Sequence, residues 1–247
     1  MNSKCLIITG MHRSGTSLIA SYLKMCGLNI GENLLTPFKD NIKGYYEDVD
    51  FLKFHKKILY KNKKNMFLAK NVYFDIDDLR EAFVLIHDKA KPLWGWKDPR
   101  TTLFLNFWQL LIDSPYFLFI YRHPFEVIDS LIRRKTDKEL KINPFIAAKS
   151  WILYNEIILD FIKSNQQNTI LINIRDLINN HQNFICAINK KFNFYLRNEN
   201  FNKVYDKDLF TSEQIYRIIT KIIIHFYRSK FNSLFRKLEL LKYDLEH

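Results

Sequence analysis

The segment from Ile7 to Leu18 combines an apolar run, a glycine loop and the beginning of an amphipathic stretch. It predicts a strand, a tight loop and a helix, with Gly10 and Gly15 in the loop. Successive backbone N–H groups in such a loop, together with the positive end of the following helix, form a cradle for a phosphate-like anion. The glycines allow the backbone to approach the ligand closely. We therefore expect an anion site here.

The residues inside this loop indicate which anions it could bind and which reactions it could support. Gly10 and Gly15 have the spacing of a nucleoside triphosphatase loop, but Thr16 stands where the lysine of that loop is expected. Hydrolysis of ATP or GTP is therefore disfavoured. A guanidinium with several hydroxyl and amide donors suits a sulfate or phosphate without a bound metal ion. The residues that we expect to contact the anion are His12, Arg13, Ser14, Gly15, Thr16 and Ser17.

A second candidate anion site follows the apolar run from Phe117 to Tyr121. This run predicts a buried strand, and Pro124 is well placed as the first residue of the next helix. Arg122 at the strand end and Ser130 eight positions later could hold one phosphate between a guanidinium and a hydroxyl.

The elements that must position these residues alternate along the chain. Short β-branched or aromatic runs are separated by stretches long enough for crossover helices, which is typical of an α/β fold with a central parallel β-sheet flanked by helices. We expect one domain over residues 1–244 and interpret residues 245–247 as a remnant of an expression tag. The expected strands are Cys5 to Thr9, Leu93 to Trp96, Phe117 to Tyr121 and Thr169 to Ile174.

Two helices are expected outside these anion sites. Phe51, Phe54 and Ile58 lie on one face of a lysine-rich helix, whose lysines we interpret as a solvated face. Near the C-terminus, Thr211 and Gln214 form a capping box. The stripe that follows has helical spacing, and we expect it to face the core: Ile215, Ile219, Ile222 and Phe226.

The composition of the chain indicates which kinds of partner and which cellular compartment to expect. The 247 residues carry a formal charge of +12, which favours anionic ligands. The longest aromatic apolar stretch is too short to span a bilayer, so no membrane span is expected. The N-terminus has no secretory signal pattern, and the three cysteines (Cys5, Cys26 and Cys186) suit reduced thiols. We expect a cytoplasmic protein.

Together, the Arg-Ser-Gly-Thr loop and the Arg-x7-Ser element about a hundred residues later resemble the sulfotransferases. Gly44-Tyr45-Tyr46-Glu47 resembles a string of bacterial members, and Lys97-Asp98-Pro99 is similar to an element of the tyrosylprotein enzymes. The resemblance implies a three-layer fold like that of P-loop proteins. It also implies the donor 3′-phosphoadenosine 5′-phosphosulfate, with adenosine 3′,5′-bisphosphate as product and no metal. The first loop would bind the 5′-phosphosulfate, and Arg122 and Ser130 the 3′-phosphate.

Sulfuryl transfer needs positive charge at the leaving phosphate and a base for the acceptor proton. Arg13 and Lys97 are the candidates for the charge. Glu47 is the first candidate for the base, and Glu32 is the main alternative. His12 and His55 are weaker candidates for the base, and Asp98 is expected to orient Lys97 or Arg100.

Two other functions fit parts of the pattern. A nucleotide-dependent kinase of related fold would need magnesium, and the missing loop lysine weakens it. A nucleic-acid-binding module would explain the charge but neither Arg–Ser element, so no nucleic-acid partner is expected. The expected acceptor is a small molecule or carbohydrate bearing a hydroxyl or amine, and no residue pattern specifies the oligomeric state.

Overall fold

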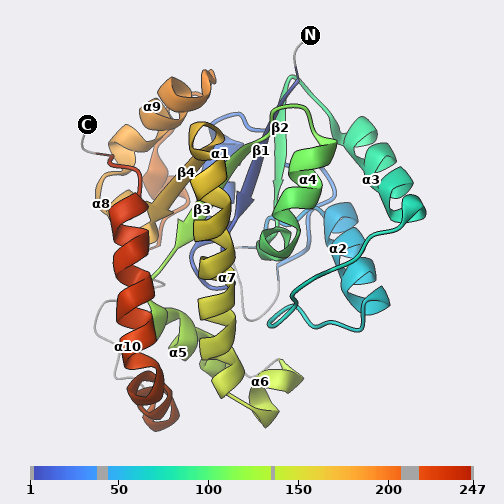
Figure 1. Cartoon of the computed structure of the whole chain (residues 1–247). Coiled ribbons are helices and arrows are strands. Elements are labelled where there is room, and N and C mark those ends of the chain that lie inside the picture. Colours follow the sequence, from blue (N-terminus) through green and yellow to red (C-terminus); the bar gives the residue numbers. More distant parts are fainter. Residues whose placement is uncertain (1–2, 38–43, 135–136, 207–216, 246–247) are drawn as a thin grey trace.

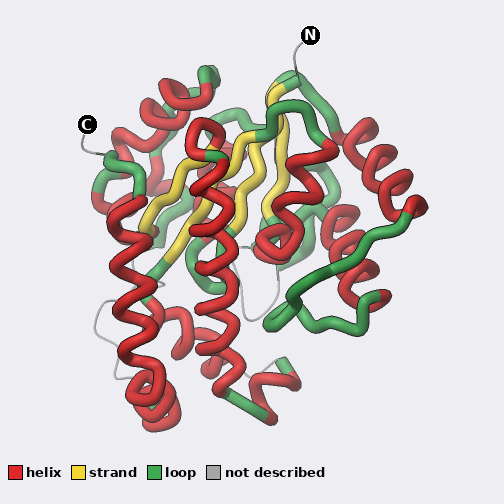
Figure 2. Tube along the Cα trace, viewed as in Figure 1, coloured by secondary structure: helices red, strands yellow, loops and turns green. Residues whose placement is uncertain are grey.

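The centre of the molecule is a sheet of four parallel strands (Figures 1 and 2). The computed structural model describes residues 3–37, 44–134, 137–206 and 217–245. The strand order is β2-β1-β3-β4. This confirms the predicted parallel α/β fold, and the observed strands differ from the expected ones by one residue at an end: β1 (Lys4–Thr9), β2 (Leu93–Lys97), β3 (Tyr116–Tyr121) and β4 (Thr169–Asn173).

Helices cover both faces of this sheet, which makes the three layers visible in Figure 1. The α-helices are α1 (Thr16–Met25), α2 (Val49–Lys61), α3 (Ile76–Lys89), α4 (Leu105–Leu111), α5 (Pro124–Arg134), α6 (Lys138–Ile142), α7 (Phe145–Ser164), α8 (Ile174–Asn179), α9 (His181–Phe192) and α10 (Ile218–Leu241). Three short 3₁₀ helices are η1 (Pro99–Phe104), η2 (Gln166–Asn168) and η3 (Phe201–Lys203).

The alternation of side chains along β1 divides the interior into two cores. Cys5 and Ile7 point to the core shared with α2, α4, α5, α7 and α10, whereas Leu6 and Ile8 point to the core shared with α1, α8 and α9. Each strand of a parallel sheet is buried on both faces, which explains the continuous apolar runs in the sequence. The polar residues therefore gather where the strands end.

The beginning of α2 sets the position of the residue before it. Asp48 caps this helix, because its carboxylate accepts hydrogen bonds from the backbone N–H groups of Asp50 and Phe51 at 2.9 and 3.4 Å. Glu47 immediately precedes this cap. The predicted apolar face of the helix is confirmed, since Phe51, Phe54 and Ile58 are buried.

The expected core stripe of the C-terminal helix is wrong at two of the three positions that the structure describes. In α10, Ile219 is half-buried and packs against the core, whereas Ile222 is 43% exposed and Phe226 is 71% exposed. The buried apolar residues are instead Ile223, Phe231, Leu234 and Leu238, on the face that packs against α7 and α5. The first half of α10 is apolar around most of its circumference, so the sequence contains two helical stripes and packing selects one. The capping box and Ile215 lie outside the described residues.

The C-terminal segment after α10 packs on the sheet. The backbone N–H of Tyr243 donates to the carbonyl of Leu171 in β4 at 2.7 Å. Leu245, which the sequence analysis set aside with residues 246 and 247, is buried in the core beside α8 and α9 and accepts a hydrogen bond from Asn183. Cys5, Cys26 and Cys186 are free thiols. Within the described ranges, no helix has both the length and the apolarity needed to cross a membrane.

Candidate active site

The glycine loop lies between β1 and α1, at the carboxyl edge of the sheet. Gly10 has a φ of 147°, and a Cβ there would lie 2.1 Å from the carbonyl oxygen of Ile120 in β3. Gly15, with a φ of 95°, is the N-cap of α1, and Arg13 between them also has a left-handed φ, of 70°. The loop thus turns tightly over the neighbouring strand, which requires glycine at its first position.

The N-terminus of α1 has the properties of an anion site. Its N-cap makes no side-chain hydrogen bond, and no acidic residue lies in its first turn. Within the described part of the chain, two buried polar atoms of the loop lack a hydrogen-bond partner, Ser14 Oγ and His12 Nε2. Buried polar atoms are normally satisfied, and donors at a helix N-terminus are commonly satisfied by a bound anion.

A direct hydrogen bond joins the two anion-binding elements predicted from the sequence. Arg13 Nε in the loop donates to Ser130 Oγ in α5 at 2.9 Å, across 117 positions of sequence. Arg122, at the end of β3, is buried, and its carbonyl accepts a hydrogen bond from the indole N–H of Trp151 at 3.2 Å. The loop, the end of β3 and the middle of α5 therefore form one region.

In the described part of the chain, the hydroxyl of Ser17 makes no hydrogen bond to α5 or to the end of β3. It donates to the backbone carbonyl of Tyr45 at 3.2 Å, so it ties α1 to the Gly44–Glu47 segment. The structure therefore brings this segment, which the sequence analysis associated with catalysis, against the helix of the glycine loop. Thr16, the remaining hydroxyl of the loop, is buried in the first turn of α1.

Two residues beside Arg122 were missed by the sequence analysis. Glu126 in α5 accepts a hydrogen bond from Arg122 Nε, and its other carboxylate oxygen accepts one from Arg175 Nε at 2.8 Å. Burial alone would raise the pKa of Glu126, but the two guanidiniums outweigh it and lower the pKa below its ordinary value. One carboxylate thus orients two arginines, of which Arg175 at the beginning of α8 is partly exposed.

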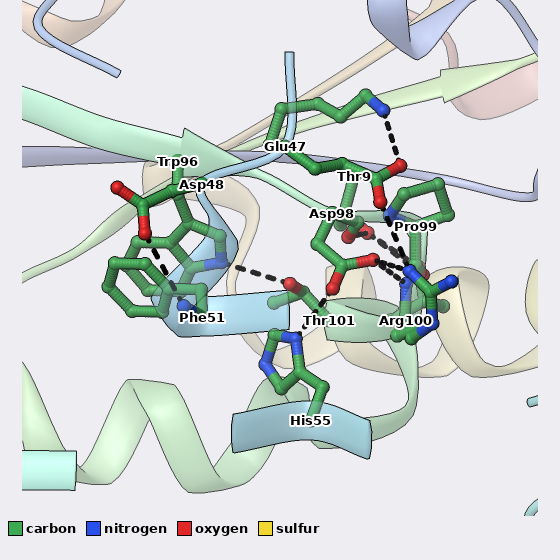
Figure 3. A network of polar contacts seen from close by, with 12 residues as sticks. Thr9, Glu47, Asp48, Phe51, His55, Trp96, Asp98, Pro99, Arg100 and Thr101 are labelled. Carbon is green, nitrogen blue, oxygen red and sulfur yellow. Dashed lines mark hydrogen bonds and ion pairs between the residues drawn. The ribbon is translucent and has the colours of Figure 1, made fainter. Parts of the chain in front are cut away.

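The second half of the site is a row of buried charges at the end of β2 (Figure 3). Lys97, only 1% exposed, donates from Nζ to Glu47 Oε1 at 2.8 Å. Glu47 Oε2 accepts a hydrogen bond from Arg100 Nη1 at 3.2 Å. Both oxygens of this carboxylate therefore face cations, and the sequence-predicted pair of Glu47 and Lys97 lies together.

The row continues from Arg100 to the interior of the molecule. Asp98 Oδ1 accepts hydrogen bonds from Arg100 Nη1 and from the backbone N–H of Arg100, both at 2.9 Å. Asp98 Oδ2 is 2.8 Å from Nδ1 of His55 in α2. Burial opposes ionisation of Asp98, but Arg100 and these hydrogen bonds outweigh it, so the pKa of Asp98 lies well below its ordinary value. The predicted orienting role of Asp98 applies to Arg100.

Glu32, the alternative base, lies in a different environment. It is exposed and lines a cavity of about 570 Å³ along the outer edge of β2, together with Asp48, Lys89 and Trp94. Lys97 and the residues of the glycine loop do not line this cavity. The structure therefore brings Glu47, and not Glu32, to the candidate catalytic lysine.

His12 is buried in the glycine loop beside the rings of Phe67 and Tyr154. Burial lowers its pKa well below the ordinary value, and the positive charges of Arg100, Lys97 and Arg134 lower it further, with Asp98 opposing them. His12 is therefore a neutral imidazole among cations. It provides a polar atom to the site without adding charge.

The sequence analysis missed Glu126 and Arg175, and it named Arg100 only as a possible partner of Asp98. Glu126 had a weak signal, because it stands four positions after Arg122 in the first turn of the expected helix. Arg175 had no signal, because its partner lies 49 positions away. In the described residues, no group of three or more histidine, cysteine, aspartate or glutamate side chains could hold a metal ion.

With this geometry in view, comparison with solved structures identifies the fold. A sulfotransferase domain from the curacin biosynthetic pathway superposes with a TM-score of 0.54 and 13% identity over 92% of this chain and 98% of its own. The sulfotransferase domain of the Synechococcus PCC 7002 olefin synthase gives 0.52 and 16% identity over 98% and 95%. A sulfotransferase from Alicyclobacillus acidocaldarius gives 0.55 and 12% over 98% and 96%. The chain has the sulfotransferase fold. No protein-family model and no curated protein sequence matches it.

Proposed function

We propose that the protein transfers a sulfuryl group from 3′-phosphoadenosine 5′-phosphosulfate to a hydroxyl or amine of a small-molecule or carbohydrate acceptor. The observation that carries this proposal is the hydrogen bond between Arg13 and Ser130, which joins two anion-binding elements at one edge of the sheet. A donor with a phosphosulfate and a separate 3′-phosphate needs two such elements. The sulfotransferase fold supports the same assignment.

The residues present fit this donor. The unpartnered Ser14 Oγ and the uncapped N-terminus of α1 suit the 5′-phosphosulfate, with Arg13 beside them. Arg122, Arg175 and Ser130 suit the 3′-phosphate, because the two guanidiniums and the hydroxyl lie around Glu126 and Arg13. Guanidiniums suit a phosphate dianion, because they can donate two parallel hydrogen bonds to its oxygens. No metal is part of the proposal.

The charges at the end of β2 support the transfer step. As the bond from sulfur to the acceptor oxygen or nitrogen forms and the bond from sulfur to the bridging phosphate oxygen breaks, the leaving phosphate gains negative charge, which the ammonium of Lys97 stabilises. The acceptor proton passes to Glu47. Two hydrogen bonds occupy about half of the roughly four lone-pair positions of that carboxylate, so acceptor capacity remains.

The location that we propose is the cytoplasm, where this donor would meet a reducing environment. Free thiols at Cys5, Cys26 and Cys186 support it, because thiols persist in reducing compartments. The acceptor proposed is a small molecule or a carbohydrate, because the candidate catalytic residues at the end of β2 are buried and do not form part of an exposed surface.

Ligand-dependent melting tests the donor assignment. Adenosine 3′,5′-bisphosphate at a hundredfold excess over its dissociation constant should increase the free energy of unfolding by about 2.7 kcal/mol. Adenosine 5′-monophosphate and ATP should give much smaller shifts at equal concentration, because neither provides the 3′-phosphate. Equal shifts for the bisphosphate and the monophosphate would remove the second phosphate site.

A transfer assay with a sulfur-labelled donor and a panel of hydroxyl and amine acceptors tests the reaction itself. Product should form equally with magnesium and with a chelator present, because sulfuryl transfer relies here on protein cations. Magnesium-dependent transfer of phosphate from ATP would instead assign the kinase activity. Binding of oligonucleotides that weakens steeply with salt, without sulfuryl transfer, would assign the nucleic-acid-binding function.

A further inference from the structure

A continuous row of hydrogen bonds leads from the candidate catalytic lysine to a buried histidine. It passes from Lys97 through Glu47, Arg100 and Asp98 to His55, with each donor and acceptor 2.8 to 3.2 Å apart (Figure 3). His55 is fully buried in α2. None of the described contacts of His55 is with a residue of the glycine loop. Its effect on any reaction must therefore pass through the side chains between it and Lys97.

We propose that His55 is a positioning residue, which holds the ammonium of Lys97 in place through Asp98, Arg100 and Glu47 as a neutral imidazole with its proton on Nδ1. This inference rests on the proposed sulfuryl transfer for its effect on rate. The protonation state and the geometry do not depend on that function.

The proton position follows from the neighbour on the other side of the ring. Trp108 Nε1 in α4 is 3.0 Å from His55 Nε2. An indole nitrogen can only donate a hydrogen bond, so His55 Nε2 must accept and carries no proton. The remaining ring nitrogen, Nδ1, then carries the proton and donates it to Asp98 Oδ2 at 2.8 Å. One tryptophan thereby selects the tautomer.

The formal charges of the row sum to zero only if His55 is neutral. Lys97 and Arg100 contribute two positive charges, and Glu47 and Asp98 contribute two negative charges. A second proton on His55 would add an uncompensated charge to a site that is buried along its whole length, which is costly. It would also turn the hydrogen bond from Trp108 into a contact between two donors.

The ring environment of His55 adds no other charge. Among the described residues in contact with the imidazole, Phe104 of η1 stacks on it with ring centroids 4.9 Å apart, and Trp108 and Phe54 meet it at steeper angles. Asp98 is the charged group that it contacts directly, with Arg100 behind. The position of Asp98 is therefore set by His55 and by the backbone of η1.

The row transmits position because Arg100 bridges two carboxylates. Its Nη1 donates to both Asp98 Oδ1 and Glu47 Oε2. If Asp98 loses the hydrogen bond from His55, it can rotate, Arg100 can follow it, and Glu47 then loses one of the two cations that hold it. The ammonium of Lys97 is held by that same Glu47. A displacement of about 1 Å at a reacting charge can lower a rate by roughly 100-fold.

Nuclear magnetic resonance of the ¹⁵N-labelled wild-type protein tests the protonation state without any substrate. We expect His55 to show the pattern of a neutral ring with its proton on Nδ1 in neutral buffer. A proton on Nε2, or a doubly protonated ring under these conditions, would overturn the inference. The ammonium resonance of Lys97 should shift in His55→Leu and stay near its wild-type position in His55→Gln.

Three variants test the effect on the reaction. His55→Gln can still donate to Asp98 and accept from Trp108, whereas His55→Leu can do neither, and Trp108→Phe removes the group that selects the tautomer. The assay is turnover of labelled donor to adenosine 3′,5′-bisphosphate and sulfate with water as acceptor, so no acceptor needs to be known. His87→Leu, at an exposed position of α3, is the matched control.

We expect His55→Leu to lower kcat by about 10- to 100-fold, with the donor KM and the dissociation constant of the bisphosphate within about twofold of wild type. Most of kcat should return in His55→Gln. In Trp108→Phe, kcat should fall with little change in KM, and His55 should no longer show the resonance pattern of a ring protonated on Nδ1 alone. Bisphosphate binding and melting curves identify variants that remain folded.

Equal kcat values in folded His55→Gln and His55→Leu, or a loss confined to KM, would overturn the positioning role. If wild-type protein neither binds the bisphosphate nor consumes the donor, the proposed function fails. The tautomer of His55 and the response of the Lys97 resonance would still decide this inference in that case.

Discussion

The two halves of the candidate active site carry their charges differently. At the end of β2, two cations and two carboxylates form a buried row in which every charge has an opposite partner. At the end of β3, Arg122 and Arg175 hold one carboxylate, Glu126, between them, and Arg175 is partly exposed. Arg13 contacts Ser130 beside them. Among these named residues, the first half is internally neutral and the second half has more arginines than carboxylates.

This difference indicates that the two halves have separate roles in the reaction. A balanced, buried row keeps its geometry without a ligand, because each group already has its partners and water is excluded. A region with excess positive charge is suited to attracting a dianion from solution. We therefore expect changes in the first half to affect the rate of transfer and changes in the second half to affect donor affinity. Three predictions test that division.

The largest effect is expected from Glu47→Gln. This change keeps the size of the side chain but removes its ability to take the acceptor proton, so turnover on a confirmed acceptor should fall by roughly 10²- to 10⁴-fold. Affinity for adenosine 3′,5′-bisphosphate, measured by titration calorimetry, should barely change. Single-turnover kinetics gives the rate of the chemical step.

Glu32→Gln is the matched control for this prediction, because Glu32 lines the separate cavity beside β2. It should keep a rate near that of wild type. Collapse of the rate in Glu32→Gln with normal chemistry in Glu47→Gln would transfer the role of base to Glu32. A bisphosphate affinity that falls in parallel with the rate in Glu47→Gln would break the division between the two halves.

An intermediate effect is expected from Arg122→Ala and Arg175→Ala. Each removes a charged donor that we assign to the 3′-phosphate, and a hydrogen bond to a charged group contributes about 1.5 to 3 kcal/mol. The bisphosphate should therefore bind roughly 10- to 100-fold more weakly, whereas binding of adenosine 5′-monophosphate should stay nearly constant. Calorimetry with both nucleotides measures the ratio.

Arg236→Ala, at an exposed position of α10, controls for the loss of one positive charge from the surface. It should weaken the binding of both nucleotides slightly and equally. If Arg175→Ala behaves like this control while Arg122→Ala shows the selective loss, Arg175 has only an electrostatic role at long range.

The smallest effect is expected from the pH dependence of His12. Its pKa in the folded protein lies well below the ordinary value of 6.5, so its contribution to stability is present above pH 6.5 and is lost as the pH falls below it. From pH 7.5 to pH 5.5 the free energy of unfolding should therefore decrease by roughly 1 kcal/mol. Denaturant unfolding at the two pH values measures it.

His12→Gln should have a shallower pH dependence of stability by that amount, and His87→Gln, at an exposed histidine, should match wild type. Identical dependence in wild type and His12→Gln would mean that burial and the nearby cations do not hold His12 neutral. The prediction thus tests whether the glycine loop keeps an uncharged imidazole.

Much of the fold could be predicted from local patterns. The strands are short apolar runs, β3 among them follows a proline and precedes an arginine, and Pro124 begins a helix, as its fixed φ predicts. The stripe of α10 failed for a physical reason, since a helix that is apolar around most of its surface has no unique inward face until it packs. Periodicity identified the helix but not its orientation.

The candidate site shows the same contrast between what local sequence patterns predict and what packing decides. Local sequence patterns were enough to predict which residues bind an anion, because the glycine loop and the Arg–Ser spacing each follow the end of a strand. Tertiary structure alone decided that Arg13 meets Ser130, that Glu47 and not Glu32 meets Lys97, and that Glu126 meets Arg175. These contacts join residues 49 to 117 positions apart, and they form because the carboxyl ends of parallel strands converge at one edge of the sheet.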